Sequence, residues 1–262
     1  MLAYRGFIFD LDGTIYRGER LIPGADEAVA ALRRRGLKVV FVTNKPLYSR
    51  AEYAAKLTRL GIPTPVEDII SSSYVMAHYL NRQEPGTTVY CIGEPPLVEE
   101  LAAAGIEVVD DPRRARFLVV GFDRTFDYRK LTGAMLAIRA GARFVATNPD
   151  RTCPVEDGEI PDCAGMVGAV TGVTGAVPEA VVGKPSPYMV AAALDRLGCE
   201  PAEVGIAGDR LNTDIAMGKA AGMTTFFVLT GADSADLLAD ERLPKPDFVV
   251  QSVAEIPDLL GA

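Results

Sequence analysis

The stretch GFIFDLDGT at residues 6–14 decides the predicted fold. Its apolar part predicts a buried strand that ends at two carboxylates, Asp10 and Asp12. Side chains two residues apart lie on one face of an extended chain, and two like charges that close repel each other unless a cation lies between them. Oxygen ligands of this kind are those that Mg²⁺ prefers. A solvated acidic turn is the alternative, but the strand before the acids and Gly13-Thr14 behind them favour a magnesium site.

Short apolar strands alternate with amphipathic helices after this stretch. A helix is predicted at residues 25–35, and LKVVFV at residues 37–42 predicts a strand that is covered on both faces. Another helix is predicted to begin after Ser49 and to end at Gly61. Further strands are predicted at 180–182, 204–207, 225–228 and 248–250, and further helices at 188–197 and 214–221. This alternation predicts an α/β fold with a doubly wound parallel sheet.

The middle of the chain carries a second strand–helix series. Its strands are predicted at 88–92, 117–120 and 144–146, and its helices at 96–104 and 128–140. The tripeptide at 84–86 (EPG) and the dipeptide at 177–178 (VP) are suited to the turns that lead into and out of this series. We therefore expect a smaller α/β domain at residues 84–179, inserted into a core domain made of residues 1–83 and 180–262.

Three more polar segments follow predicted strands, where open α/β sheets place their binding crevice. Thr43 and Asn44 offer a hydroxyl and a backbone N–H to phosphoryl oxygens, and Lys184 in GKPS is a compact cation suited to phosphate. Asp209 and Asp214 in GDRLNTD can complete a metal site. Each segment alone has a simpler explanation: a cap, an exposed loop lysine, or acids that stabilise a helix N-terminus. Together they predict a site for a metal ion and a phosphoryl group.

The composition is that of a globular protein and disfavours several partners. The chain has 262 residues, of which 48% are hydrophobic and 24% charged, and its net charge of −8 argues against a nucleic-acid partner. The charge-free stretch at 163–178 is shorter than the ~20 apolar residues of a membrane span, so no membrane partner is expected. The four cysteines form no C-x-x-C pair, and no secretory signal is visible, which predicts a cytoplasmic protein.

The four polar segments together resemble the haloacid dehalogenase superfamily of phosphohydrolases, since DLDGT, TN, GKP and GDRLNTD occur in that family's order. The insertion contains VGFDRTFDYRKL and ATNPDRTCPVEDG and resembles that of the NagD and 4-nitrophenylphosphatase subfamily, whose α/β cap is inserted at this point. Within the subfamily, the run from TNPDRTCPVEDG to VVGKPS is most similar to the sugar phosphatases of bacterial arabinose operons. Lys45-Pro46 departs from the pattern, because many relatives continue there with asparagine.

The resemblance implies a role for each acid. Asp10 would be the nucleophile that forms an aspartyl-phosphate, and Asp12 the general acid and then the base. A bound Mg²⁺ would be held by Asp10, the backbone carbonyl of Asp12 and Asp209. Asp214 would hold a metal-bound water or Lys184 in place.

The resemblance also implies how the substrate binds. Phosphoryl oxygens would contact Thr43, Lys184 and the N–H groups of Leu11 and Asn44. The cap residues that would read the rest of the substrate, or else form a structural turn, are Asn148, Asp150 and Arg151. The expected substrate is a small phosphorylated metabolite, with sugar phosphates leading and phosphoglycolate, glycerol phosphate, nucleoside monophosphates and pyridoxal phosphate left open. A homodimer formed through the cap is expected from the relatives.

Three other classes of protein share parts of this pattern. A phospho-accepting receiver module also uses clustered aspartates, a threonine, a lysine and Mg²⁺, but it is a single small domain whose phosphorylated aspartate lies on a later strand. A dinucleotide-binding oxidoreductase would carry G-x-G-x-x-G after the first strand, where this chain has its acids. A relative that only binds is disfavoured, because every expected catalytic residue type is present.

Overall fold

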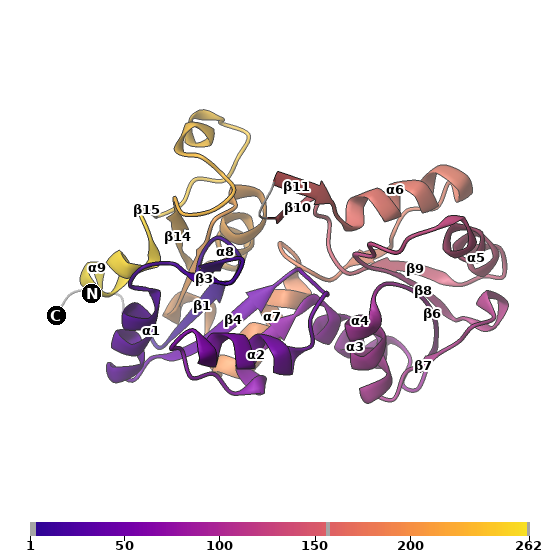
Figure 1. The fold of residues 1–262 in the computed structure, drawn as a ribbon, viewed down its shortest axis with the longest axis horizontal. Helices are drawn as coiled ribbons and strands as arrows, with labels where there is room; N and C mark the ends of the chain where they lie inside the picture. The colour runs from indigo at the N-terminus through magenta and orange to yellow at the C-terminus, as the bar shows by residue number, and fades with distance from the viewer. Residues whose placement is uncertain (1–3, 156–157, 261–262) are drawn as a thin grey trace. The chain divides into compact units, whose positions relative to one another are not determined.

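Strand β1 (Gly6–Asp10) lies inside a six-stranded sheet with the order β15-β14-β13-β1-β4-β5 (Figure 1). The computed structural model describes residues 4–155 and 158–260. The other strands of this sheet are β4 (Lys38–Thr43), β5 (Ile69–Ser71), β13 (Val204–Gly208), β14 (Thr224–Val228) and β15 (Phe248–Val250). β1 pairs in parallel with β4 on one side and with β13 on the other. The order of the strands therefore reverses between β1 and β13, and open α/β sheets bind ligands beside the carboxyl ends of the strands at such a point.

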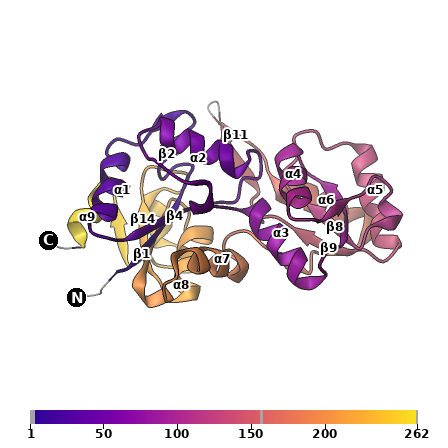
Figure 2. The same ribbon diagram turned by 90° about the horizontal axis from the view of Figure 1, so that it is seen from below.

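Helices cover both faces of this sheet (Figure 2). α1 (Ala25–Arg34) and α2 (Arg50–Arg59) lie on one face, and α7 (Pro187–Leu197) and α8 (Ala216–Ala221) lie on the other. The remaining short elements are the hairpin β2 (Tyr16–Arg17) and β3 (Arg20–Leu21), the helix α9 (Ile256–Leu259) and the 3-10 turns Val66–Asp68, Pro201–Glu203, Ala235–Ala239 and Val253–Glu255. The predicted doubly wound parallel sheet is confirmed.

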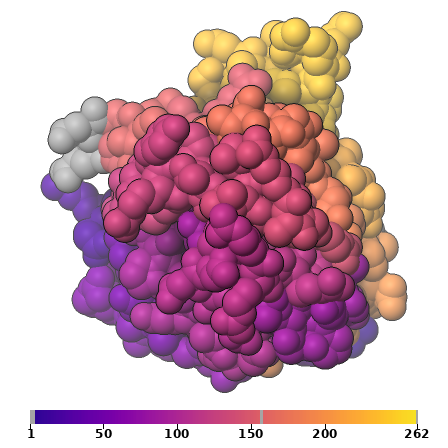
Figure 3. Space-filling model, turned by 90° about the vertical axis from the view of Figure 1, so that its right-hand side faces the viewer, coloured from indigo at the N-terminus to yellow at the C-terminus, as the bar shows by residue number. Residues whose placement is uncertain are grey.

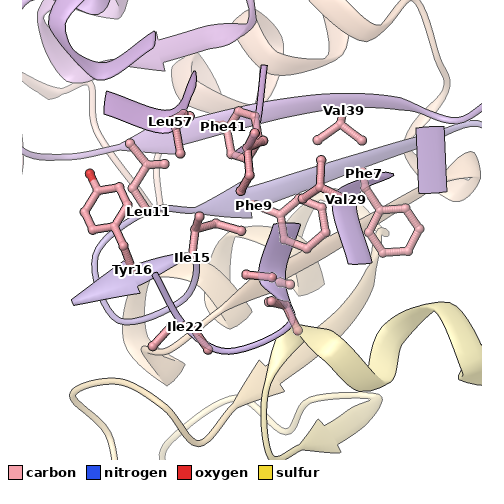
Figure 4. Close-up of a cluster of buried hydrophobic side chains, with 14 of the residues drawn as sticks. Phe7, Phe9, Leu11, Ile15, Tyr16, Ile22, Val29, Val39, Phe41 and Leu57 are labelled. Carbon is pink, nitrogen blue, oxygen red and sulfur yellow. The ribbon is translucent and has the colours of Figure 1, made fainter. Parts of the chain in front are cut away.

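Aromatic and branched side chains fill the space between the sheet and the helices α1 and α2 (Figure 4). Phe7 and Phe9 of β1 stack with their ring centroids 5.7 Å apart, and Phe41 of β4 lies beside them. Val29 of α1 and Leu57 of α2 complete this layer. Burial of each such side chain stabilises the fold by about 1.5–3 kcal/mol, which fixes the direction of β1 and thus the place of its last residue.

A second sheet is built from the middle of the chain, with the order β12-β9-β8-β6-β7. Its strands are β6 (Thr88–Ile92), β7 (Glu107–Val108), β8 (Phe117–Val120), β9 (Arg143–Ala146) and β12 (Ala180–Val181). The helices around it are α3 (Ser72–Gln83), α4 (Pro95–Ala103), α5 (Tyr128–Arg139) and α6 (Cys163–Thr174), with a 3-10 turn at Pro112–Arg114 and a hairpin of β10 (Thr152–Val155) and β11 (Gly158–Pro161). The residues of this part, magenta to salmon in Figure 3, form one continuous surface.

Contacts divide the chain into two compact units whose boundaries differ from the expected ones. The first unit comprises the residues up to Thr43, Arg50–Ile70 and the residues from Lys184 onward, within the described ranges. The second unit comprises Asn44–Ser49 and Ser71–Gly183.

Two elements whose residues are expected to lie in the core domain, α3 and β12, belong to the second unit. Helix α3 packs against α4, and the side-chain amide of Asn81 donates to the carbonyl of Ala104 at 2.9 Å. Strand β12 pairs in parallel with β9 through Ala180 and Val181. The second unit therefore begins at Ser71 rather than at residue 84, and it retains the strand that the sequence predicts to open the returning half of the core.

The charge-free stretch at 163–178 contains the 12-residue helix α6. This helix ends at Gly175, which has a positive φ of 73°. Met166 and Val170 pack into the core of the second unit. None of the helices in the described ranges combines the length and the apolar character that a membrane crossing requires.

Candidate active site

The first two carboxylates lie at the carboxyl end of β1, but not on one extended strand. Asp10 is the last residue of β1, and 7% of it is exposed. The chain turns directly afterwards, because the carbonyl of Leu11 accepts the N–H groups of residues 14, 15 and 16 at 2.9–3.2 Å. Asp12 is half-buried and lies in this turn. The two acids therefore do not share the strand face that the sequence predicts.

Three carboxylates lie together at this edge of the sheet: Asp10, Asp209 and Asp214. One oxygen of each lies within 4.8 Å of the others. Asp209 directly follows β13, and Asp214 lies in a π-helical turn, Leu211–Ile215, that precedes α8. All three are more than nine-tenths buried. Because β1 and β13 are neighbouring strands, acids from the two ends of the chain meet at the point where the strand order reverses.

Lys184 joins this cluster from the segment GKPS. Only 4% of its surface is exposed. Its Nζ donates to Oδ1 of Asp10 and, at 2.7 Å, to Oδ1 of Asp214. The other oxygen of Asp214 accepts the backbone N–H of Arg210 at 3.2 Å. The lysine is thus fixed between two acids, and the contact expected between Asp214 and Lys184 is present.

The charges in this cluster perturb one another. Burial raises the pKa of Asp10 well above its usual range, with Lys184 opposing the shift and the two other acids adding to it. Burial raises the pKa of Asp209 to about 7, with the nearby Asp214 contributing in the same direction. Burial alone would lower the pKa of Lys184, but Asp10 and Asp214 outweigh it and hold that pKa above its ordinary value. Lys184 is therefore charged at neutral pH.

The cluster has the donors and the charge for a hard divalent cation. Its ligand atoms are carboxylate oxygens, which suit Mg²⁺. One buried lysine cannot neutralise three ionised carboxylates, and burial already opposes the ionisation of Asp10 and Asp209. A divalent cation between these oxygens would remove that imbalance, so the residues present fit a bound Mg²⁺.

Glycine is required next to the acids because the backbone approaches them closely. A Cβ atom on Gly208 would lie 2.2 Å from Cγ of Asp214. Gly13 has a φ of +87°, and a Cβ there would lie 2.4 Å from Oδ2 of Asp209. The glycines in DLDGT and GDRLNTD thus have a packing reason in addition to their turn geometry.

Thr43 is the last residue of β4 and Asn44 follows it, but they belong to different units. Asp10 pairs with Val42 across the sheet, so Thr43 lies one residue beyond Asp10 along the neighbouring strand, and it is buried. Asn44 begins the second unit. Its side-chain amide donates to Oδ2 of Asp150 at 2.8 Å, and its carbonyl accepts the hydroxyl of Ser72 at 2.8 Å. The side chain of Asn44 therefore serves the second unit.

The residues expected to read the substrate divide into two kinds. Asn148 is buried, and its amide donates to Asp150 at 2.9 Å and to Asp162 at 3.0 Å. Asp150 also accepts from Asn44, so it is the centre of a network inside the second unit. Burial raises the pKa of Asp162 to about 6. Arg151, by contrast, is exposed. The side chains of Asn148 and Asp150 are thus engaged in hydrogen bonds inside the second unit, whereas Arg151 is exposed to solvent.

Two parts of these networks are not predicted by the sequence. Asp162, which holds Asn148 and caps α6 at the N–H of Cys163, carries no motif of its own. Residues 230–233 (TGAD) follow β14 and contact Asp209. The signal in the sequence is weak: a threonine and a glycine come shortly after the apolar run of β14, whereas the pair Thr43-Asn44 is polar at both positions.

Comparison with known proteins gives a consistent result. Residues 7–107 match the profile of the family described as haloacid dehalogenase-like hydrolase, and residues 181–256 match a second profile described as HAD-hydrolase-like. The chain is 43% identical over 254 residues to the sugar-phosphatase AraL of Bacillus subtilis, which covers 97% of this chain and 92% of the relative. It is 34% identical to an acid sugar phosphatase of Staphylococcus epidermidis, with 93% of each chain covered.

Solved structures agree with this result. A p-nitrophenyl phosphatase from Archaeoglobus fulgidus superposes with a TM-score of 0.93 at 38% identity, covering 98% of this chain and 99% of the other. NagD from Escherichia coli K-12 superposes with a TM-score of 0.88 at 32% identity, covering 97% and 98%. These likenesses extend over both units.

Proposed function

Because the chain belongs to the haloacid dehalogenase-like hydrolases and is a phosphatase of that family, we propose that it hydrolyses phosphomonoesters of small metabolites through an aspartyl-phosphate on Asp10. The observation that carries the proposal is the buried cluster of Asp10, Asp209 and Asp214 around Lys184, at the reversal of strand order. A nucleophile, a fixed cation and further carboxylates at one sheet edge are what phosphoryl transfer to a carboxylate needs.

Asp10 acts first. One carboxylate oxygen forms a bond to phosphorus while the ester P–O bond on the opposite side breaks. The ammonium of Lys184, held by Asp10 and Asp214, lies where negative charge accumulates on the transferred group. It favours the ionised form of Asp10, which is the form that can attack, against the burial that raises the pKa of this carboxyl.

Asp12 transfers the protons. It gives its proton to the oxygen of the leaving alcohol as the ester bond breaks, and then takes a proton from the water that attacks phosphorus. Phosphate leaves, and the carboxylate of Asp10 is regenerated. The position of Asp12 in the turn after β1 supports this division, because its carboxyl lies outside the cluster that Lys184 and the other acids form.

The carboxylates of Asp10 and Asp209 and the backbone carbonyl of Asp12 would hold Mg²⁺, and Asp214 would hold a metal-bound water or Lys184 in place. When bound, the cation supplies positive charge that offsets the carboxylates and the phosphoryl oxygens. Thr43, Lys184 and the N–H groups of Leu11 and Asn44 are proposed to orient these oxygens. Leu11 follows β1, Thr43 ends β4 and Asn44 follows β4, which supports this role.

The proposed function predicts metal-dependent release of phosphate over many turnovers. Purified protein is incubated with a panel of pentose and hexose phosphates, phosphoglycolate, glycerol phosphate, a nucleoside monophosphate and pyridoxal phosphate, with Mg²⁺ or with EDTA. We expect turnover with Mg²⁺ and a loss of at least about a hundredfold with EDTA, because uncompensated buried carboxylates repel the phosphoryl group.

Two outcomes would contradict the proposal. A folded protein that releases no phosphate from any ester would point to a binding role. A protein that accepts one phosphoryl group and then stops would point to a receiver-like role, since a receiver keeps its phosphoryl group as a signal.

The substrate class is proposed to be sugar phosphates, with Arg151 reading the part of the molecule beyond the phosphate. The relatives named above as sugar phosphatases support the class. The exposure of Arg151 supports its role, because the side chains of Asn148 and Asp150 are engaged in hydrogen bonds inside the second unit.

Replacing Arg151 with alanine should lower kcat/KM for the preferred sugar phosphate by about 10-fold, the typical effect of losing one charge-assisted hydrogen bond. It should leave kcat/KM for p-nitrophenyl phosphate unchanged, because that leaving group offers no hydroxyls. Arg139→Ala, which removes another exposed arginine of the same unit at the end of α5, is the matched control. An equal loss on both substrates, or no loss on either, would exclude this role for Arg151.

Two further expectations stay predictions. The family resemblance implies a homodimer formed through the cap, and the cysteine pattern predicts a cytoplasmic location. Neither bears on the chemistry proposed above.

A further inference from the structure

A short turn after β14 encloses Asp209. The backbone N–H of Ala232 donates to Oδ2 of Asp209 at 2.7 Å, and the N–H of Asp233 donates to the carbonyl of Asp209 at 3.3 Å. The carboxylate of Asp233 accepts the N–H of Leu211 at 2.8 Å. This turn, residues 230–233, therefore contacts Asp209 and also the residue that opens the π-helical turn carrying Asp214.

The same turn is tied to the segment that follows the nucleophile. The hydroxyl of Thr230 donates to the carbonyl of Gly13 at 2.6 Å. The guanidinium of Arg17, in the hairpin after that segment, donates to the carbonyl of Gly231 at 3.3 Å. The 230–233 turn thus bridges the loop after β1 and the loop after β13, which are the two loops that carry Asp10, Asp12 and Asp209.

Gly231 leaves no room for a side chain. A Cβ atom there would lie 1.9 Å from Oδ2 and 2.1 Å from Cβ of Asp209. On the other side, a Cβ on Gly13 would lie 2.9 Å from Cα of Gly231. Asp209 is therefore held between two glycines whose backbones define where its carboxylate lies.

We propose that the 230–233 turn positions Asp209 and thereby sets the affinity of the carboxylate cluster for a divalent cation. The inference rests on the proposed function, because it takes this cluster to be the cation site. A carboxylate that accepts a fixed backbone N–H at one oxygen has its plane and its second oxygen oriented before the cation arrives. Thr230 acts through the turn and through Gly13, so it is a positioning residue.

The alternative is that the turn only stabilises the fold. In that case the loss of the Thr230 hydroxyl would lower the melting temperature and leave the cation affinity of the folded protein unchanged. Cation binding measured directly, without turnover, separates the two roles.

The experiment is a calorimetric titration of Mg²⁺ into the full chain, with wild type, Thr230→Val and Thr230→Ser. We expect Thr230→Val to raise the Kd for Mg²⁺ by about 10-fold, the low end of the range for residues that orient a metal ligand. Thr230→Ser keeps the hydroxyl and should restore the wild-type Kd. At saturating Mg²⁺ the KM for substrate should be close to that of wild type in both variants.

Thr225→Val is the matched control. Thr225 is fully buried on β14, the strand that precedes the 230–233 turn, and its hydroxyl donates to Asp247 at 2.7 Å, away from the carboxylate cluster. This variant should lose thermal stability without a change in the Kd for Mg²⁺. Gly231→Ala should weaken Mg²⁺ binding more than Thr230→Val does, because the new methyl group displaces Asp209 itself.

An unchanged Kd in folded Thr230→Val and Gly231→Ala would overturn the inference and leave the proposed function intact. The inference would also fail if Thr225→Val weakened Mg²⁺ binding as much as Thr230→Val, or if Thr230→Ser did not restore it. A wild-type protein that binds no Mg²⁺ would instead overturn the magnesium part of the proposed function and the inference with it.

Discussion

Replacing Asp10 with asparagine should reduce phosphate release by at least about a thousandfold, the scale seen when an enzyme loses its nucleophile. The amide cannot form an aspartyl-phosphate, although it has nearly the same shape as the carboxylate. The rate is measured as phosphate released at saturating Mg²⁺ from the best substrate of the panel. A variant that retained more than a few per cent of the wild-type kcat would show that Asp10 is not the nucleophile.

The same substitution should not destabilise the protein, which separates chemistry from folding. Burial raises the pKa of Asp10, so its ionised form is unfavourable in the folded state. Lys184 keeps its hydrogen bond to Asp214 when Asp10 becomes an amide. We therefore expect a melting temperature equal to or above that of wild type in EDTA. A large fall would mean that the lost turnover reports unfolding.

The second large effect is expected from Lys184→Met. Lys184 is the buried cation between Asp10 and Asp214, and its removal leaves these acids without a counter-charge. Breaking a buried ion pair by removing one partner typically costs about 3–5 kcal/mol, because the remaining charge stays buried and uncompensated. We expect a loss of that size in the free energy of unfolding, measured by urea denaturation at neutral pH in EDTA, together with loss of turnover.

Lys219→Met is the matched control for this measurement. Lys219 pairs with Asp247 at 2.7 Å, but both side chains are more than one-third exposed. An exposed pair of this kind contributes about 0–1 kcal/mol. If the two variants lost the same stability, the charge balance assigned to the carboxylate cluster would be wrong.

Much of the first unit could be predicted because its signals are local. The apolar runs at Phe7 and Phe41 specify buried strands by composition alone, and the polar residue that ends each run lies at the sheet edge as expected. The parallel arrangement follows from the alternation of strands with helices. Asp10 and Asp209 meet because they lie at the carboxyl ends of neighbouring strands of one sheet, and Lys184 joins them from the segment after β12.

Other features depend on contacts that no local pattern records. The sequence predicts that β12 opens the returning half of the core, but this strand pairs with β9, since an edge strand can pair with any free neighbour that the topology brings close. The sequence also groups Asn148 and Asp150 with Arg151 in one substrate-reading loop. The first two turn inward because Asp162 and Asn44 supply hydrogen bonds that only the folded chain brings together.

The sequence by itself determined the class of fold, the family and the kinds of residue at the site, because apolar periodicity and short motifs are properties of neighbouring residues. Only the tertiary structure decided how the predicted acids lie relative to one another. The turn that begins at Leu11 takes Asp12 off the strand face of Asp10, and the pairing of β1 with β13 brings Asp209 next to Asp10. The place of Asp209 depends on the strand order, which sets β13 beside β1, and on the 230–233 turn, which binds Gly13 through Thr230. Both features join residues from opposite ends of the chain.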